Sequence, residues 1–460
     1  MKTPGEQLDA TIGAVAKLEA QVADLHAQTV AIGKTVVVNG DDLAKQMHAL
    51  ATKVARLEGR IPPPAPNPQP LPPPIDPPEP TPVGGFLARE PGSNAIECGE
   101  GDDLSLRLQQ AQKDKHNVRD IVLTHDGLYD VGRIGEIYRS GMYIGAAPGE
   151  NPILRLNGTG FSTRNHIEDL QLVGLTAVGE GEGTLLSITG SAKNILIEDC
   201  RTDALQIGLR VYPSGDNVVE GLTINRCILM NSYHSGGHED AHGALLKAVR
   251  NGVFTENVVV GNGRRDSANP DRSHGVYFSP RPDDREDDRA YPWQISGNLF
   301  ANNSSHGFKG GPGADVDDNL FIGNAIAFYV SRNSSSARRN AILDSADLNP
   351  DRPRGYGFQA FQMDRFDAID NIVANTRTAR PEASGAFAIE DNGVPGERRG
   401  NRVFAQPQGR GIADGVEYID DRLDHGVDLD SLIEAETNRP RGEWSPIIAS
   451  AMKQIREAAA

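Results

Sequence analysis

The feature that most constrains the fold is a short segment that recurs nine times between residues 167 and 403. In most copies an apolar residue is followed three positions later by a marker residue and two positions after that by a second apolar residue. Successive markers lie 21 to 41 residues apart. A recurring segment with this minimum period predicts the coils of a parallel β-helix, in which the short strands of each coil stack on those of the next. The markers are Leu170, Cys200, Cys227, Asn257, Asn298, Asn319, Asn340, Asn371 and Asn401.

The identity of the markers adds two expectations. From Asn257 onward every marker is asparagine, a residue that tolerates the left-handed conformation and bonds to backbone, so we expect a ladder of side-chain amides at one turn. Cys200 and Cys227 occupy marker positions one coil apart and are expected to be buried free thiols. Intervals longer than 21 residues indicate coils with inserted loops.

The segment before the repeats predicts a cap. Asp102 and Asp103 are placed to begin an amphipathic helix over residues 102–112, and the strand sequences IVL, DGLY and GMYIGA follow it. A helix there would cover the open edge of the first coil. Together with the coil repeats, this segment resembles the pectate-lyase-like right-handed parallel β-helix superfamily over about residues 97–405. The resemblance implies an all-β, single-stranded right-handed β-helix, and it leaves the reaction open because that superfamily includes lyases, hydrolases, epimerases and binders.

Three further regions flank the predicted β-helix of residues 84–405. Residues 1–60 contain two stretches with the a/d spacing of a coiled coil, which predicts association of helices, with a helical hairpin as the alternative. Residues 61–83 hold 13 prolines and predict a stiff polyproline II spacer of roughly 60–70 Å. Residues 406–460 form a C-terminal extension whose last part, from Ser445 and Pro446 onward, predicts a helix docked on the last coils.

Charge and composition exclude some classes of protein. The formal net charge of −17 argues against binding to nucleic acid or to an anionic membrane. The sequence contains no apolar run of 18 residues, so membrane insertion is not expected. The first residues lack the apolar core of a signal peptide. Three cysteines cannot all pair, so we expect a chain that is made and kept in reducing cytoplasm, or is carried out of it by lysis.

Three histidines follow successive markers in the tripeptides AHG and SHG. If the coils are in register, His242, His274 and His306 lie one rung apart, at about 4.8 Å. Stacked imidazoles suggest either a metal or proton-transfer site, or a buried ladder. Strand alternation places them on the same face as apolar residues such as Phe308, which favours the ladder and leaves open whether they face a groove or the interior.

By the same alternation, the opposite face carries a row that suits sugar binding. Tyrosine rings stack on pyranose faces and a lysine pairs with uronate or sulfate, so Tyr277, Lys309 and Tyr329 are candidate glycan-binding residues. β-Elimination of a uronide needs a base and a cation, roles that Tyr277 and Lys309 are placed to fill. The alternative is an ordinary exposed strand face. The row is Leu245, Tyr277, Lys309, Tyr329 and Gln359.

A second candidate is the polar cluster HSGGHEDAHG at residues 234–243. Its Glu239, Asp240 and His242 are candidate catalytic residues, either at a metal or as part of a carboxylate pair for glycoside hydrolysis. Asp266 or Asp271, in the following loop, would complete such a pair and would also line the glycan site. The alternative is a solvated loop. The pattern assigns no metal site or cofactor, although it leaves a divalent cation open.

The order of these regions predicts a function. A helical tip, a stiff stalk and a capped β-helix without a signal peptide are typical of a phage tail spike or virion fibre. On this interpretation the chain is a homotrimer in the virion that binds other virion proteins through residues 1–60. It also binds, and in one version depolymerises, a host surface polysaccharide on the coils between Cys227 and Asn319. The alternatives are a free bacterial polysaccharide lyase or glycoside hydrolase, secreted by a non-classical route, and a non-catalytic glycan-binding β-helix.

Overall fold

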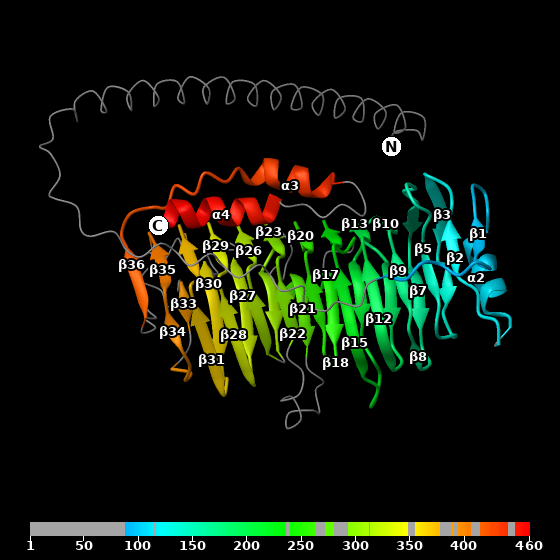
Figure 1. Ribbon diagram of the computed structural model, residues 1–460, viewed down its shortest axis with the longest axis horizontal. Helices are drawn as coiled ribbons and strands as arrows, with labels where there is room; N and C mark the ends of the chain where they lie inside the picture. Colours follow the sequence, from blue (N-terminus) through cyan, green and yellow to red (C-terminus); the bar gives the residue numbers. More distant parts are fainter. Residues whose placement is uncertain are drawn as a thin grey trace, which may run out of the picture. The chain divides into compact units, whose positions relative to one another are not determined.

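The recurring segment forms the coils of a right-handed parallel β-helix (Figure 1). The computed structural model describes residues 88–114, 116–235, 240–263, 272–279, 293–311, 313–347, 355–377, 388–390, 393–405, 415–439 and 447–460. The predicted helices of residues 1–60 and the proline-rich segment 61–83 lie outside the described residues and stay predictions. Every coil contributes strands to three long parallel sheets.

From Cys200 onward, the markers lie at the turn after the strands of a 14-stranded sheet. The first predicted marker is wrong: Leu170 lies between two strands of this sheet, and Leu175, just before the Thr176 that pairs with Arg201, occupies the position equivalent to Cys200. Because residues directly opposite each other in neighbouring coils pair in parallel, the apolar residue before each marker stacks on its counterpart, as Ile224 does on Phe254. The strands are β1 (Ile96–Cys98), β2 (Ile121–Leu123), β5 (Tyr143–Ala146), β8 (Ile167–Glu168), β9 (Gln171–Val173), β12 (Ala192–Glu198), β15 (Val219–Asn225), β18 (Val249–Arg250), β19 (Val253–Thr255), β22 (Trp293–Ser296), β25 (Ala314–Asp317), β28 (Ser334–Arg338), β31 (Arg365–Ile369) and β34 (Arg398–Arg399).

The residues after each marker form a 12-stranded sheet. Its strands are mostly three residues long, and the later ones, such as Val258–Val260 and Leu320–Ile322, are wholly apolar and buried on both faces. They are β3 (Leu128–Gly132), β6 (Ile153–Leu156), β10 (Thr176–Val178), β13 (Arg201–Asp203), β16 (Ile228–Met230), β20 (Val258–Val260), β23 (Leu299–Ala301), β26 (Leu320–Ile322), β29 (Ala341–Leu343), β32 (Ile372–Ala374), β35 (Asn401–Phe404) and β36 (Val416–Ile419).

A 10-stranded sheet closes each coil and holds the histidine and tyrosine candidates. Its strands are β4 (Gly135–Glu136), β7 (Thr159–Thr163), β11 (Thr184–Ile188), β14 (Ile207–Val211), β17 (His242–Lys247), β21 (His274–Ser279), β24 (His306–Gly310), β27 (Ile326–Ser331), β30 (Tyr356–Phe361) and β33 (Ile389–Glu390).

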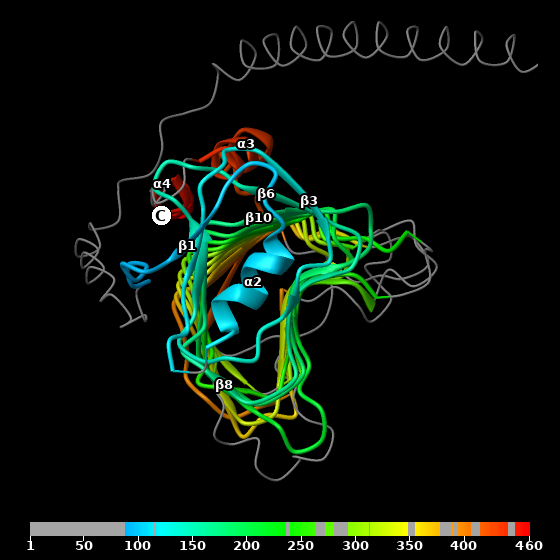
Figure 2. The same cartoon turned by 90° about the vertical axis from the view of Figure 1, so that its right-hand side faces the viewer.

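The capping helix is α2 (Leu104–Gln112), and it begins after Asp103, whose side chain accepts a hydrogen bond from the amide of Leu106. Leu104, Leu108 and Ala111 are buried against the first coil. Figure 2, a view along the β-helix, shows α2 lying across the end of the coil stack. The predicted cap is confirmed.

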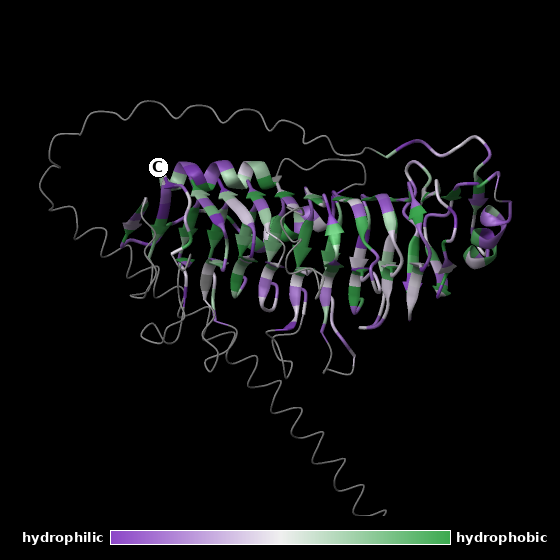
Figure 3. Cartoon of the chain, turned by 90° about the horizontal axis from the view of Figure 1, so that it is seen from below, coloured by the Kyte–Doolittle hydropathy of each residue, from purple (hydrophilic) through white to green (hydrophobic). Residues whose placement is uncertain are grey.

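Aromatic stacking fills the interior in the middle coils. Phe308, Phe328 and Phe358 stack from coil to coil with ring centroids 5.2 and 4.9 Å apart, and all three are fully buried. Figure 3 colours the chain by hydropathy: hydrophobic residues, in green, lie along the strands, and many hydrophilic residues, in purple, lie in the turns that join them. Phe328 therefore has a stacked phenylalanine in the coil on each side, which orders the interior.

The asparagine ladder is confirmed, although its conformational cause differs from the expected one. The amide of Asn298 donates to Oδ1 of Asn319 at 3.0 Å, and the amide of Asn319 donates to Oδ1 of Asn340 at the same distance. The left-handed residue is the one before the marker, such as Asp318 at φ 55°, and not the asparagine itself. The asparagine side chain instead satisfies backbone groups that the tight turn leaves unpaired.

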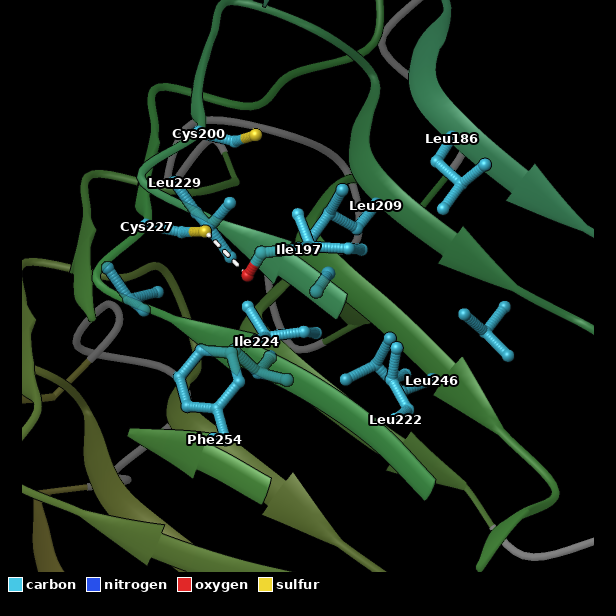
Figure 4. Close-up of a cluster of buried hydrophobic side chains, with 14 of the residues drawn as sticks. Leu186, Ile197, Cys200, Leu209, Leu222, Ile224, Cys227, Leu229, Leu246 and Phe254 are labelled. Atoms are coloured by element: carbon cyan, nitrogen blue, oxygen red, sulfur yellow. Dashed lines mark hydrogen bonds between the residues drawn. The ribbon is translucent and has the colours of Figure 1, made fainter. Parts of the chain in front are cut away.

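Cys200 and Cys227 are buried free thiols, as predicted. Figure 4 shows both sulfur atoms among apolar side chains of neighbouring coils, with Cys227 Sγ bonded to the carbonyl oxygen of Ile197 at 3.4 Å. Burial raises the pKa of the Cys227 thiol well above its ordinary value.

Two helices cover the outer face of the 12-stranded sheet (Figure 1). The sequence predicted the second, α4 (Ile447–Ala459), and missed the first, α3 (Leu429–Thr437), which begins after the N-cap Asp428. Ile455 and Leu432 are buried against outward residues of the sheet, including Leu320. Across the described residues, no helix is both long and apolar enough to span a membrane.

Candidate functional site

The outer face of the 10-stranded sheet carries a row of side chains in continuous register. Tyr277 pairs with Lys309, and Lys309 pairs with Tyr329. All three side chains are partly exposed. The strand pairing extends the row in both directions, to give the order Arg210, Leu245, Tyr277, Lys309, Tyr329, Gln359 and Glu390. The structure thus brings together three of the residues that the sequence singled out.

Within the row, an aromatic ring lies beside a cation. Lys309 Nζ lies 5.3 Å from the centroid of the Tyr277 ring. Tyr329, on the other side of Lys309, is half-buried, and this burial raises the pKa of its phenol. The arrangement presents an ammonium between two rings, which suits a sugar that carries an anionic group.

Acidic side chains are absent from the described strands at the centre of this sheet. The strands β7, β11, β14, β17, β21, β24 and β27 contain no Asp or Glu. The first carboxylates along the row are Glu136 on β4 and Glu390 on β33, at the two ends of the sheet. On a chain with a net charge of −17, this local excess of cations is a distinctive property of the face.

The three histidines are buried and adjacent to the tyrosine row: the rings of His242 and His274 are stacked, and those of His274 and His306 meet edge to face. Their ring centroids are 5.4 Å apart between His242 and His274 and 4.8 Å apart between His274 and His306. The amide of His274 donates to Nδ1 of His242 at 3.2 Å, and Ser305 Oγ lies 2.7 Å from Nδ1 of His306. The hydrogen-bonded stack has the form of the ladder that the sequence favoured.

The expected separation of histidines and tyrosines onto opposite faces is wrong. The rings of His274 and Tyr277 have centroids 5.3 Å apart, which requires both to lie on the same side of the strand. A Cβ at Gly275 would meet the core side chain of Val259 at 2.9 Å, and Val276 is itself fully buried in the core. Two successive residues therefore face the interior, and the period-two alternation breaks between them.

Burial favours the neutral form of His242 and His274. It lowers the pKa of His242 to about 4, and nearby Lys309 adds to the shift. It also lowers the pKa of His274 well below its ordinary value, with contributions from the neighbouring His306 and His242. The Nδ1 atom of His274 is buried and has no hydrogen-bond partner in the described structure. The histidine side chains therefore lie beside the tyrosine row and are largely inaccessible to solvent.

The other candidates are divided between described and undescribed residues. Asp240 is exposed and precedes β17, and its carbonyl oxygen accepts a hydrogen bond from Gln206 Nε2 at 3.5 Å. Glu239, Asp266 and Asp271 lie outside the described residues, so their roles stay predictions. No group of three or more potential metal ligands occurs in the part of the chain that the structure describes.

Where the strands of the 14-stranded sheet end, and in the turn that follows, several acids are paired with arginines. Asp318 contacts Arg339 at 2.6 Å, and Glu198 contacts Arg226 at the same distance. Burial raises the pKa of Asp317, the last residue of β25, to about 6. These pairs neutralise one another, whereas Glu220 and Asp315, on the outer face of the same sheet, accept hydrogen bonds from Asn251 and Ser336. The remaining carboxylates make this face less suited to an anionic ligand.

The sequence analysis missed three residues beside the predicted row. Tyr212 is 41% exposed and lies between Arg210 and Lys247, whose charged groups lie 5.7 and 4.3 Å from its ring centroid. The signal was available, since extending the row by one coil beyond Leu245 leads to Arg210.

Comparisons with known proteins agree with the fold. No protein-family model and no curated protein matches the chain. Among solved structures, the Dettilon tailspike protein is similar, with 10% identity, a TM-score of 0.38, and coverage of 71% of this chain and 68% of that chain. The PL6 family alginate lyase AlyGC is similar with 10% identity, a TM-score of 0.40, and coverage of 77% of this chain and 57% of that chain. At this identity and TM-score, neither likeness assigns a function. The sheet topology itself shows that the chain is a right-handed parallel β-helix with three parallel sheets.

Proposed function

We propose that this chain is a polysaccharide-binding β-helix and that the outer face of the 10-stranded sheet is its binding surface. The observation that carries the proposal is the row of Tyr277, Lys309 and Tyr329, in register on described strands without carboxylates. The 12-stranded sheet is covered by α3 and α4, and the outer face of the 14-stranded sheet carries acids such as Glu220 and Asp315, which do not favour an anionic glycan. This leaves the 10-stranded sheet as the face best suited to a ligand.

The test is binding of the full chain to an array of bacterial capsular and lipopolysaccharide glycans. We expect binding to a subset of these glycans, and we expect Tyr277→Ala and Lys309→Met to weaken it without changing the melting temperature. Lys193→Met is the matched control, because Lys193 is exposed on β12 of the 14-stranded sheet. Equal binding by all four proteins would place the site elsewhere.

The proposed biological setting is a virion spike. In it the chain is a homotrimer, residues 1–60 join it to other virion proteins, and the β-helix meets the host surface. The order of predicted regions along the chain supports this setting. Sedimentation should give a trimer for the full chain, and a monomer both for this chain and after removal of residues 1–83 would contradict the proposal.

A second proposed activity is cleavage of the bound glycan by β-elimination. The observation that favours elimination over glycoside hydrolysis is the absence of Asp and Glu from the central described strands, because hydrolysis needs two carboxyl groups about 5–9.5 Å apart. In the elimination, Tyr277 takes the C5 proton of a uronide and Lys309 stabilises the enolate-like intermediate. The C4–O bond then breaks, the departing oxygen takes up that proton from Tyr277, and an unsaturated uronide remains. Size exclusion together with ultraviolet absorbance of unsaturated uronides detects this product, and shortening without absorbance would indicate hydrolysis instead.

A further inference from the structure

A second aromatic and cationic cluster lies one coil before the predicted row. It consists of Arg210 on β14, Tyr212 directly after β14, and Lys247 at the end of β17. Val211 pairs with Leu246. Tyr212 follows Val211 and Lys247 follows Leu246, so these two residues are neighbours in adjacent coils. Lys247 Nζ lies 4.3 Å from the centroid of the Tyr212 ring.

The cations in this cluster lack anionic partners. Neither Arg210 nor Lys247 makes an ion pair or a hydrogen bond with any residue that the structure describes. The guanidinium of Arg210 and the ammonium of Lys247 each lie over the ring of Tyr212. Lys247 is only 9% exposed. Covering an ammonium without a counter-charge is unfavourable, whereas an ordinary surface lysine keeps its charged end in water. The cluster is therefore suited to an incoming anion.

The cluster repeats the geometry of the predicted row. In both places a tyrosine is followed, one coil later, by a lysine whose Nζ lies over the ring, at 4.3 Å from Tyr212 and 5.3 Å from Tyr277. The two tyrosines are two coils apart and offset by two residues along the strand, which corresponds to a separation of roughly 12 Å. A polymer with a repeating anionic group is able to occupy both clusters at once.

We propose that Arg210, Tyr212 and Lys247 form a second glycan subsite, in which the sugar stacks on Tyr212 and both cations bind its carboxylate or sulfate group. With Tyr277 and Lys309, this subsite selects an acidic polysaccharide that crosses the 10-stranded sheet obliquely. The inference rests on the proposed function and adds the class of glycan and a second contact site.

The experiment measures binding of the full chain to three immobilised polymers of matched length: polygalacturonate, dextran sulfate and neutral dextran. We expect binding to at least one acidic polymer, with the carboxylate and sulfate polymers identifying the preferred group, and weaker binding as salt is raised from 50 to 200 mM by the general screening of charge. Lys247→Met keeps the stem length and should weaken binding about fivefold to tenfold, whereas Lys193→Met should leave it unchanged. Tyr212→Ala should weaken binding by a similar factor.

The outcomes separate this inference from the proposed function. Equal binding to neutral dextran and to the acidic polymers, or full binding by Lys247→Met with an unchanged melting temperature, would overturn the inference and leave the proposed function standing. Absence of binding both to these polymers and to every glycan on the bacterial array would contradict the proposed function and this inference together.

Discussion

The outer faces of the 12-stranded and 10-stranded sheets are built by the same coils, and they differ in which residues point outward. On the first face the outward residues are apolar, such as Leu299 and Leu320, and the helices α3 and α4 bury them. On the second face Tyr277 and Lys309 are partly exposed, and no described helix lies against them. One face of a β-helix can therefore contribute to stability while another is available for recognition, and the same coil backbone provides both.

The largest expected effect is loss of stability when the covered face is disrupted. Ile455 on α4 is fully buried, so Ile455→Asp should place an unpaired charge against the 12-stranded sheet and lower the free energy of unfolding by about 4 kcal/mol. Chemical denaturation measures this change. Gln454→Asp, at an exposed position of the same helix, should change stability by less than about 0.5 kcal/mol. Similar losses in both variants would show that α4 is not anchored by this face.

The second expected effect is a pH dependence that belongs to the 10-stranded sheet. The pKa of His242 is about 4 in the folded chain and 6.5 in its ordinary state, so the unfolded chain binds the extra proton first as the pH falls. The stability conferred by the neutral ring is complete above pH 6.5 and declines by up to about 1.4 kcal/mol per pH unit towards pH 4.

Denaturation at several pH values measures this slope. His242→Gln should make the slope shallower between pH 6.5 and 4 than it is in the parent chain. His274, whose pKa is also lowered by burial, adds to the slope in both proteins. An unchanged slope in His242→Gln would show that this ring is accessible to protons in the folded chain.

The third effect tests the turn that both faces share. Asn319 Nδ2 donates to the carbonyl oxygens of Ile295 and Asp317 at 2.9 and 3.0 Å, and these partners stay buried when the side chain is removed. Asn319→Ala should therefore lower the free energy of unfolding by about 1–3 kcal/mol, as measured by thermal or chemical unfolding. Asn165→Ala, at an exposed position outside the ladder, is the control. Equal stability of the two variants would remove the ladder from the account of the fold.

The smallest expected effect concerns glycan binding on the outer face of the 10-stranded sheet. Tyr277→Ala and Lys309→Met should each weaken glycan binding by about 1 kcal/mol, or roughly fivefold, because each removes one stacking or cationic contact. Their double mutant should lose less than the sum, since Lys309 Nζ lies 5.3 Å from the Tyr277 ring and the two contacts are coupled. Additive losses in a titration against the same glycan would mean that the two residues bind separate parts of it.

The sequence predicted the coils better than it predicted the faces. The period of the markers and the chemistry of asparagine were sufficient for the stacking of Asn298 on Asn319, because both depend on local residues that repeat. The orientation of His274 was wrong, because strand alternation fails where Gly275 and Val276 both face the interior. Nothing in local spacing reveals such a break.

Long-range packing explains the other differences. Helix α3 was missed because its burial depends on the outer face of strands far away in the sequence, such as β20, and not on a strong pattern of its own. The cluster around Tyr212 was missed for a similar reason, because Arg210 and Lys247 meet at its ring only when two coils are in register. The roles of Tyr277 and Lys309 stay predictions, although the structure places them side by side.

The central claim is that glycan binds on the outer face of the 10-stranded sheet. The most direct measurement is a crystal structure of the full chain with an oligosaccharide from the glycan that it binds on the array. The account predicts sugar rings on Tyr212 and Tyr277, with anionic groups at Lys247 and Lys309. Sugar bound on the 14-stranded sheet, or between subunits away from these residues, would contradict it.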